Sequence, residues 1–441
     1  MSNINQITVS EYMDRFVSLY KLYESGLNGH RNEPISVLRR EGFNLLTKED
    51  FPTRRDEDWK YTSVTPIINQ KFIEAPKIAI ETKNEVSFET YRIQLNNGYL
   101  ANTLPIIEGV EILPLADALK NQDYASWIHG QMGKGSGTLK NTFLPLNQAF
   151  GSQGIFIKVK RNISIEIPFL IQYNSANDDQ NTPFFTSPQL FIWMEGGSNA
   201  SIIEEYASDN TDSVYFTNTA NRIELGKNAT LVHLKIQDES IEAFNVNNTM
   251  VTQMRDSNYS HYAIDLGGKI VRNNLSVGLL DSNTESHLYG AFIGYKDQHI
   301  DNQTFIDHAM PHCQSNEKYK GILLDKARGV FNGKVLVRQD AQKTNAFQQS
   351  SSLVLSPTAV MDTKPQLEIF ADDVKCSHGA TIGHLDESSV FYLNSRGLSE
   401  SQAKSLLKRA FISEVVDHIE NENFKDLAYE KIEAKLNLMN I

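Results

Sequence analysis

The stretch GSNASIIEEYASDNTDSVYFTNTANRIELGKNAT, residues 197–230, begins and ends with closely related polar turns. Between these turns, short runs of apolar residues alternate with polar ones, which is the pattern of short strands. Related turns recur further along, so that the asparagines at 199, 228, 258 and 283 are spaced by 29, 30 and 25 residues. A repeat of this length is typical of a solenoid, in which each coil buries its apolar side only against the next coil.

Strand-like alternation extends well beyond this stretch. Ile155, Ile157 and Val159 alternate with polar residues, and strand signals continue to about residue 395. Corners rich in Asn, Gly and Ser join these short runs, and the leucine-rich template L-x-x-L-x-L is missing, so the pattern favours a β-helix. A β-sandwich is the competing fold, because it also joins short strands by polar turns.

Helical periodicity appears on both sides of the strand-rich region. Residues 8–24 carry one wide apolar face, a second helix is expected behind Pro34, and a short helix is expected over 115–128. Near the C-terminus, Ser399 and Gln402 form a capping-box pattern before an amphipathic helical hairpin. The sequence therefore predicts a helical domain at 1–70, a mixed linking region at 71–150, a β-helix core at 151–397 and a helical segment at 398–441.

The composition excludes some classes of protein. The chain has 441 residues, 40% of them apolar, and a formal net charge of −12, so it offers no basic field to a nucleic acid. Two cysteines argue against a disulfide scaffold and fit a reducing compartment. The N-terminus lacks the pattern of a secretory signal, and no apolar run approaches the length of a membrane span. We therefore expect a soluble cytoplasmic protein without membrane contact.

Cys376 and His378 form the main candidate site. A thiolate and an imidazole this close in sequence can both reach one soft metal ion, or one can activate the other. The alternative is an ordinary buried cysteine, because a lone C-x-H is a weak metal motif. Iron–sulfur clusters are usually held by about four thiolates, so any cluster bound to a chain with two cysteines must be shared with another chain or be transient.

His308, His312 and Cys313 form a second cluster of metal-competent residue types. Pro311 prevents a helix from stacking the two histidines, so the pattern favours a turn with core-facing side chains. A site shared with Cys376 stays open, because a spacing of 63 residues is close to two repeats. Whether these three side chains take part in function is not decided by the sequence.

Two further stretches invite a functional reading. The Trp59 segment, residues 53–62, surrounds a tryptophan and a tyrosine with charges, and it either covers an edge of the core or forms a docking face. The glycine-rich stretch 130–138 fails as a phosphate-binding loop because Ser136 stands where lysine is required, and a flexible loop is the expectation. Common enzyme motifs such as G-x-S-x-G and H-E-x-x-H are missing.

Four stretches carry a resemblance to a known family. They are PTRRDEDWKYT at 52–62, GILLDKARGVFNGKVLV at 321–337, AQKTNAFQQSSSLVLS at 341–356 and ADDVKCSHGATIGHLDESSVFYLNSRG at 371–397. Together they resemble the SufB/SufD family, which assembles iron–sulfur clusters, and the first looks like the N-terminal signature of the family's SufD branch. The resemblance extends from residue 52 to about residue 410, nearly the whole chain.

The resemblance implies a mainly β fold, a right-handed parallel β-helix core flanked by N-terminal and C-terminal α-helical segments. It further implies a non-catalytic scaffold subunit of a SufBCD-type complex, which pairs with a SufB-like paralogue and docks a SufC-like ABC ATPase. A homodimer is expected to be possible for the isolated chain. A β-helix enzyme acting on an extended polysaccharide is the alternative, although no pair of carboxylates stands out.

The resemblance also implies roles for particular residues. Cys376 and His378 match the family's functional pair at the SufB–SufD interface, where transient iron or a nascent cluster is expected rather than a cofactor held by this chain alone. Cys376 would serve as a thiolate ligand or sulfur relay, and His378 as an iron ligand or as the base that lowers the pKa of the thiol. His384 matches no family site and is expected to be structural. The contact with the ATPase is expected on the C-terminal helix, at Ala403, Leu406, Leu407, Ala410 and Phe411.

Overall fold

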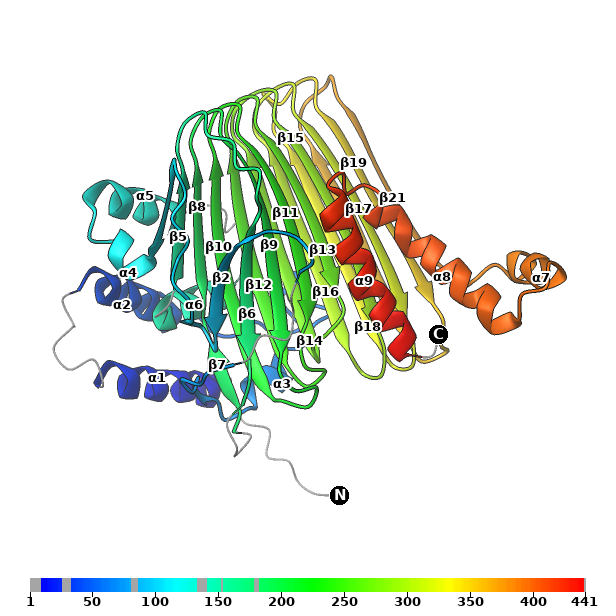
Figure 1. Cartoon of the computed structure of the whole chain (residues 1–441), viewed down its shortest axis with the longest axis horizontal. Helices are drawn as coiled ribbons and strands as arrows, with labels where there is room; N and C mark the ends of the chain where they lie inside the picture. Colours follow the sequence, from blue (N-terminus) through cyan, green and yellow to red (C-terminus); the bar gives the residue numbers. More distant parts are fainter. Residues whose placement is uncertain are drawn as a thin grey trace.

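The chain winds into a β-solenoid of about seven turns, whose strands form two mainly parallel sheets and which is flanked by helices (Figure 1). The computed structural model describes residues 9–25, 33–80, 86–132, 141–151, 154–177 and 182–439. The chain passes from one sheet to the other with almost every strand, so that strands one coil apart pair in parallel. The predicted β-helix is therefore confirmed, and the β-sandwich is excluded because sandwich sheets are antiparallel.

The strands of the solenoid fall into two sets. The first sheet contains β5 (Gly154–Val159), β8 (Gln189–Met194), β10 (Tyr215–Leu225), β12 (Phe244–Gln253), β14 (Ile270–Leu279), β16 (His299–His308), β18 (Arg328–Val337) and β20 (Val360–Ile369), with the short β7 (Phe184–Thr186) beside β10. The second sheet contains β6 (Phe169–Ser175), β9 (Asn199–Ser208), β11 (Thr230–Asp238), β13 (Asn258–Asp265), β15 (Glu285–Gly294), β17 (Gln314–Leu323), β19 (Asn345–Val354) and β21 (Lys375–Gly383).

One corner of the solenoid has a residue in the left-handed backbone conformation in successive coils. Asn228, Asp256, Asn283, His312 and Lys343 have φ values of 57°, 59°, 60°, 63° and 63°. Asparagine and aspartate tolerate this conformation better than most residues, which explains the polar turns. The strand register pairs Thr230 with positions 199 and 258. Asn199 and Asn258 are therefore equivalent, whereas Asn228 and Asn283 each lie two residues before the equivalent position. The predicted alignment of the four asparagines was wrong in this respect, although the repeat itself is confirmed.

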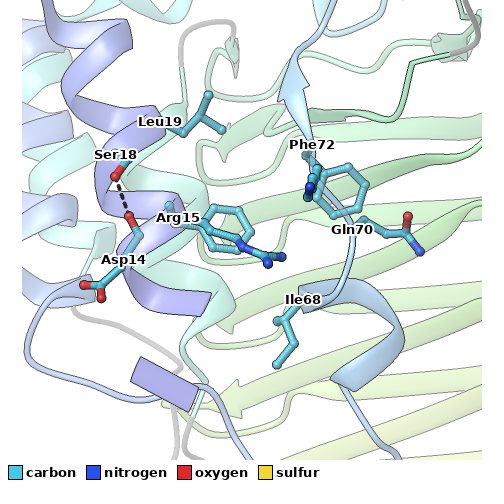
Figure 2. Close-up of a pocket in the computed structure, with 9 residues that line it drawn as sticks. Asp14, Arg15, Ser18, Leu19, Ile68, Gln70 and Phe72 are labelled. Atoms are coloured by element: carbon cyan, nitrogen blue, oxygen red, sulfur yellow. Dashed lines mark hydrogen bonds between the residues drawn. The ribbon is translucent and has the colours of Figure 1, made fainter. Parts of the chain in front are cut away.

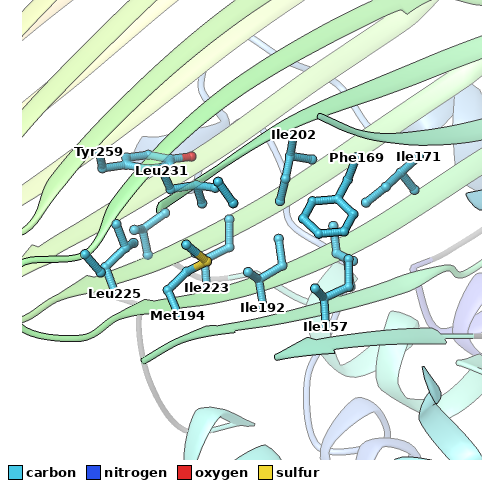
Figure 3. Close-up of a cluster of buried hydrophobic side chains, with 14 of the residues drawn as sticks. Ile157, Phe169, Ile171, Ile192, Met194, Ile202, Ile223, Leu225, Leu231 and Tyr259 are labelled. Carbon is cyan, nitrogen blue, oxygen red and sulfur yellow. The ribbon is translucent and has the colours of Figure 1, made fainter. Parts of the chain in front are cut away.

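The interior of the solenoid is built from side chains of alternate positions on both sheets. At the N-terminal half these side chains are aliphatic and aromatic, and they form one buried cluster between the two sheets (Figure 3). Burial of apolar area against neighbouring coils supplies the driving force that no single coil has alone. The side chains labelled in Figure 3 are Ile157, Phe169, Ile171, Ile192, Met194, Ile202, Ile223, Leu225, Leu231 and Tyr259.

The N-terminal end of the solenoid is closed by short strands. β4 (Val110–Pro114) pairs antiparallel with β5, and β2 (Tyr91–Asn96) continues the second sheet beyond β6. β3 (Tyr99–Leu100) pairs antiparallel with β2, and β1 (Ile73–Glu74) pairs with β7. The segment 71–150 thus supplies strands to both sheets in addition to linking the helices to the core.

Helices cover the outer faces of both sheets. α1 (Val9–Ser25), α2 (Pro34–Leu46), α3 (Thr65–Ile68) and α6 (Phe143–Phe150) lie on the outer face of the first sheet, and side chains of α1, α3 and α6 share an apolar cluster with it. α8 (Glu400–Val416) and α9 (Glu422–Leu438) pack on the second sheet. The short 3-10 turn η2 (Glu57–Trp59) joins α2 to α3. No helix among the described residues is long and apolar enough to cross a membrane.

Two details of the predicted helices were wrong. The single helix expected over 115–128 is two, α4 (Leu115–Ala118) and α5 (Gln122–Met132). Helix begins before Gly397, because α7 (Glu387–Ser395) follows the last strand, whose end at Gly383 precedes the expected limit near 395. In the glycine-rich stretch 130–138, residues 130–132 end α5, and residues 133–138 lie outside the described residues.

Candidate functional site

Cys376 and His378 lie on β21, the last strand of the second sheet. Strand register places Cys376 beside Ala346 and His378 beside Gln348 of β19. Ala346 and Gln348 are both buried and point into the solenoid, whereas Phe347 between them is exposed. Because side chains alternate along a strand, Cys376 and His378 share the inward face of the last coil. The prediction that they sit at the final strands, just before the architecture changes, is confirmed.

Cys376 is partly buried at the end of the interior. Its side chain packs against a small apolar cluster that includes Val335, Ala346 and Ala371. Burial raises the pKa of the Cys376 thiol, and the backbone of Ala346 opposes this shift by hydrogen bonding. Burial therefore disfavours the thiolate of Cys376, and the expectation that His378 lowers the pKa of this thiol stays a prediction. A metal ion or a positive group from elsewhere would have to generate the thiolate.

His378 is exposed at the open end of the solenoid. Among the described residues, no group of three or more His, Cys, Asp and Glu side chains could hold a metal ion. Cys376 and His378 together supply two soft ligands of the four that a tetrahedral iron site commonly uses. His384, by contrast, bonds through Nδ1 to the backbone carbonyl of Val354, in line with its expected structural role.

The second cluster of histidines and cysteine forms a turn, as expected. His308 ends β16 in the interior and contacts the Ser315 hydroxyl through Nε2 at 2.8 Å. His312 stands in the left-handed corner with its side chain exposed, and Cys313 is buried. Register places Ser315, and not Cys313, two coils before Cys376. The spacing of 63 residues therefore does not align the two cysteines.

The Trp59 segment covers the outer face of the first sheet. Trp59 is buried, and the guanidinium of Arg272 on β14 lies 3.7 Å from the centroid of its ring. Nη1 of Arg272 also pairs with Asp301 of β16 at 2.5 Å. Glu57 reaches further and pairs with Lys364 on β20. Of the two interpretations, the cover for a core edge is therefore supported by the contacts, and Trp59 itself is not available for docking.

The five residues expected to contact an ATPase do not share one environment. Ala403 is buried, Leu406 and Ala410 are exposed, and Leu407 and Phe411 are partly buried. The ring of Phe411 lies 4.2 Å from Nζ of Lys320, on β17. Phe411 thus helps to hold α8 on the second sheet. Only the Leu406 side of the predicted face is open to another protein.

Exposed apolar side chains gather at the C-terminal end of the molecule, and the sequence interpretation missed them. Phe370 and Ile382 of the last coil are 63% and 49% exposed, and Phe391 and Tyr392 of α7 are 74% and 57% exposed. α7 stands beyond the last strands, at the far end of α8 (Figure 1). An N-cap signal was available for α7, because the carboxylate of Asp386 accepts a hydrogen bond from the backbone N–H of Ser389 at 2.9 Å.

Two surface cavities of similar size lie at opposite ends of the protein. One, of about 390 Å³, borders β19, β21 and the end of α8, and its lining includes Phe347, His378 and His418. The other, of about 370 Å³, lies between α1 and the segment after α3, where Arg15 and Phe72 face one another (Figure 2). The first cavity adjoins the candidate site, whereas the second shares no residue with it.

Comparisons with known proteins place this architecture in a family. A family model described as "SUF system FeS cluster assembly, SufBD core domain" matches residues 174–411, and one described as "SufBD protein N-terminal region" matches residues 10–171. An iron–sulfur cluster assembly SufBD family protein of Synechocystis sp. is 32% identical over 420 residues, covering 91% of each chain.

Two further relatives show similar coverage. The iron–sulfur cluster assembly protein SufD of Escherichia coli (strain K12) is 29% identical over 396 residues, covering 89% of this chain and 90% of the relative. The Arabidopsis thaliana protein named "Protein ABCI7, chloroplastic" is 29% identical over 425 residues, covering 91% of this chain and 86% of the relative. The resemblance noted in the sequence is therefore confirmed over nearly its full length.

Proposed function

This chain belongs to the SufBD family of iron–sulfur cluster assembly proteins, and from that premise we propose that it is a non-catalytic scaffold subunit of a SufBCD-type complex. Cys376 and His378 would hold iron, or a nascent cluster, only transiently and together with ligands from a SufB-like paralogue. The iron is cargo to be passed on, and the chain itself carries out no reaction. The cytoplasm remains the predicted compartment.

The observation that carries this proposal is the position of the two candidate ligands on a strand that has one free edge. β20 and β21 end their sheets, and no further strand pairs with them among the described residues. Unpaired strand edges readily accept a strand from another chain. A partner docked there lies beside Cys376 and His378 and can complete their ligand set. The same edge can pair with a second copy, which accounts for a possible homodimer of the isolated chain.

A second part of the proposal concerns a SufC-like ABC ATPase. α7 and the first half of α8 extend past the last coil, and the exposed Phe391, Tyr392 and Leu406 provide apolar anchors there. Exposed aromatic side chains in such a position are typical of protein interfaces. The alternative of a polysaccharide-cleaving enzyme gains no support, because no specific feature of the structure favours it.

The role of His378 is tested by its replacement in the assembled complex. His378→Ala is expected to lower the iron bound per complex after anaerobic isolation. It should not unfold the chain, because the side chain of His378 is exposed and the substitution removes only a candidate iron ligand. His384→Ala is the matched control, since that imidazole bonds within the chain. Equal iron content in wild type and His378→Ala, with complex formation intact, would remove His378 from the site.

The ATPase contact is tested at Leu406, which is 45% exposed. Leu407→Asp and Phe411→Asp address the same face, but both side chains are partly buried and their loss affects folding too. Leu406→Asp is therefore the sharper variant, and it is expected to reduce retention of the ATPase on a column. Leu438→Asp, at the exposed end of α9, is the control. Unchanged retention with Leu406→Asp and with Phe391→Asp would contradict this surface.

A further inference from the structure

A row of inward-facing polar side chains leads through the last coils to His378. Strand register places Glu317 of β17 beside Gln348 of β19, and Gln348 beside His378 of β21. Glu317 and Gln348 are both almost fully buried, at 3% exposure each, while His378 is exposed at the end of the row. The amide of Gln348 therefore stands between a buried carboxyl group and the candidate ligand.

The hydrogen bonding of Gln348 fixes the direction of its amide. Its Nε2 donates to Oε2 of Glu317, on the strand of the preceding coil. The amide oxygen points away from the amide nitrogen, and it is buried without a hydrogen-bond partner among the residues that the structure describes. A buried acceptor without a donor is unfavourable, because it has lost its hydrogen bonds to water. The side of Gln348 opposite Glu317 is the side on which β21 carries His378.

We propose that Gln348 is a positioning residue for His378, whose ring N–H donates to the amide oxygen of Gln348. This inference rests on the proposed function of His378 as an iron ligand. With one ring nitrogen committed as a donor, the other keeps its lone pair and can bind iron. Histidine ligands in metalloproteins generally have such a partner, which sets the tautomer and the orientation of the ring.

Glu317 has a part in this arrangement although it does not touch His378. At pH 8, above the pKa of Glu317 of about 7, the ionised carboxylate can only accept hydrogen bonds, so the amide of Gln348 cannot turn around and present its N–H₂ group to the imidazole. Without Glu317, both orientations of the amide become available, and only one of them fits the hydrogen bond to His378. Gln349, the next residue, is exposed on the outer face of β19 and provides a matched control.

The tautomer of His378 can be measured by ¹⁵N NMR on the isolated chain at pH 8, with the signals assigned by comparison with His378→Ala. One dominant tautomer is expected in wild type and in Gln349→Met, and a mixture in Gln348→Met. If Gln348→Met does not fold, Glu317→Leu serves in its place and is also expected to give a mixture. The same tautomer distribution in wild type and in the folded variant would overturn the proposal. A water molecule as the sole hydrogen-bond donor to the amide oxygen of Gln348 would overturn it too.

Iron content provides the second readout. In the complex, Gln348→Met is expected to lower the affinity for Fe²⁺ by about 10- to 100-fold, the usual effect of losing the partner of a metal-bound histidine. Gln348→Glu keeps an acceptor oxygen and is expected to restore part of this affinity. The role of His378 and the role of Gln348 can be refuted separately. Unchanged iron content in His378→Ala refutes the role of His378 as a ligand. Unchanged tautomers of His378 in Gln348→Met refute the positioning role of Gln348, even if His378 does bind iron.

Discussion

The two ends of the solenoid are finished in opposite ways. At the N-terminal end, antiparallel strands β3 and β4 close the sheets. The N-terminal helices and the Trp59 segment cover the outer face of the first sheet. At the C-terminal end, β20 and β21 each have one edge that no strand of the described residues pairs with, and Phe370 and Ile382 are exposed in this last coil. Since uncovered strand edges promote unwanted association, proteins usually protect them. An open end of this kind is what the proposed pairing with another subunit requires.

The covered face of the first sheet at β14, between the two ends, should lose the most stability when its cover is damaged. Trp59→Ala removes a buried side chain that packs on Phe143, with ring centroids 5.3 Å apart, and it leaves Arg272 without the ring over its guanidinium. The free energy of unfolding is expected to fall by about 3–5 kcal/mol, as for other buried tryptophans. Chemical denaturation of the isolated chain measures this change. A loss below about 1 kcal/mol would show that the Trp59 segment is not part of the folded core.

The interior behind the open end should make stability depend on pH. Burial raises the pKa of Glu317 from 4.5 to about 7, so folding favours the protonated acid. The penalty for ionising this buried group is absent below the unfolded pKa near 4.5 and is fully developed above about pH 7. Stability should therefore fall between pH 5 and pH 8, with Glu317 contributing about 2–3 kcal/mol to the fall.

Glu317→Gln is the variant that isolates this contribution. It should flatten the pH dependence of the unfolding free energy by that amount, because glutamine carries no titrating proton. Glu387→Gln, at an exposed position of α7, is the control and should leave the profile unchanged. Identical pH profiles for wild type and Glu317→Gln would show that the carboxyl group is not held in a dry interior.

A proline that replaces a residue with a free N–H at the open edge should weaken association with a partner and have much less effect on folding. The backbone N–H of Lys375 donates to Thr344 of β19, so alternate residues of β21, Ala380 among them, direct their N–H groups to the free edge. Ala380→Pro removes one of these free donors and should weaken binding of the SufB-like paralogue about tenfold, or about 1.4 kcal/mol. Thr381→Pro breaks a bond to β19 and should destabilise the isolated chain instead. Equal binding of wild type and Ala380→Pro in titration calorimetry would argue against strand pairing at this edge.

The smallest effects on folding are expected at the exposed apolar residues of the open end. Phe391→Ala should change the free energy of unfolding by less than about 0.5 kcal/mol, because the side chain is 74% exposed and loses few contacts. The same denaturation assay as for Trp59→Ala provides the comparison. A loss of 2 kcal/mol or more would mean that α7 packs on the chain itself, and that its aromatic residues are not reserved for a partner.

The alternation of apolar and polar residues was sufficient to predict the solenoid, because each coil must bury one side of every strand. It was not sufficient to align the coils. Asn228 and Asn258 look equivalent in the sequence, but the corner is formed by Asn228 and Asp256, since either residue type tolerates left-handed backbone. Spacing alone also appeared to align Cys313 with Cys376, whereas pairing of the strands brings Ser315 into that position.

The candidate site was only partly accessible from the sequence. Cys376 and His378 were recognisable as residue types, and their place at the end of the strands followed from the helical signals behind them. The sequence pattern does not indicate that Ile382 belongs to the last coil. Its residue type and position therefore predict a core residue, although the side chain is exposed. The partnership of Gln348 with Glu317 depends on register between coils 31 residues apart, which no local pattern reveals.

The central claim is that another subunit covers the open edge beside Cys376 and His378. Hydrogen–deuterium exchange of the β21 amides, residues 375–383, tests it most directly, with the dilute isolated chain compared with the chain bound to the SufB-like paralogue. The account predicts that the amides of Cys376, His378 and Ala380 exchange rapidly in the isolated chain and become protected in the complex. A complex that forms while these amides continue to exchange at the rate of the isolated chain would contradict it.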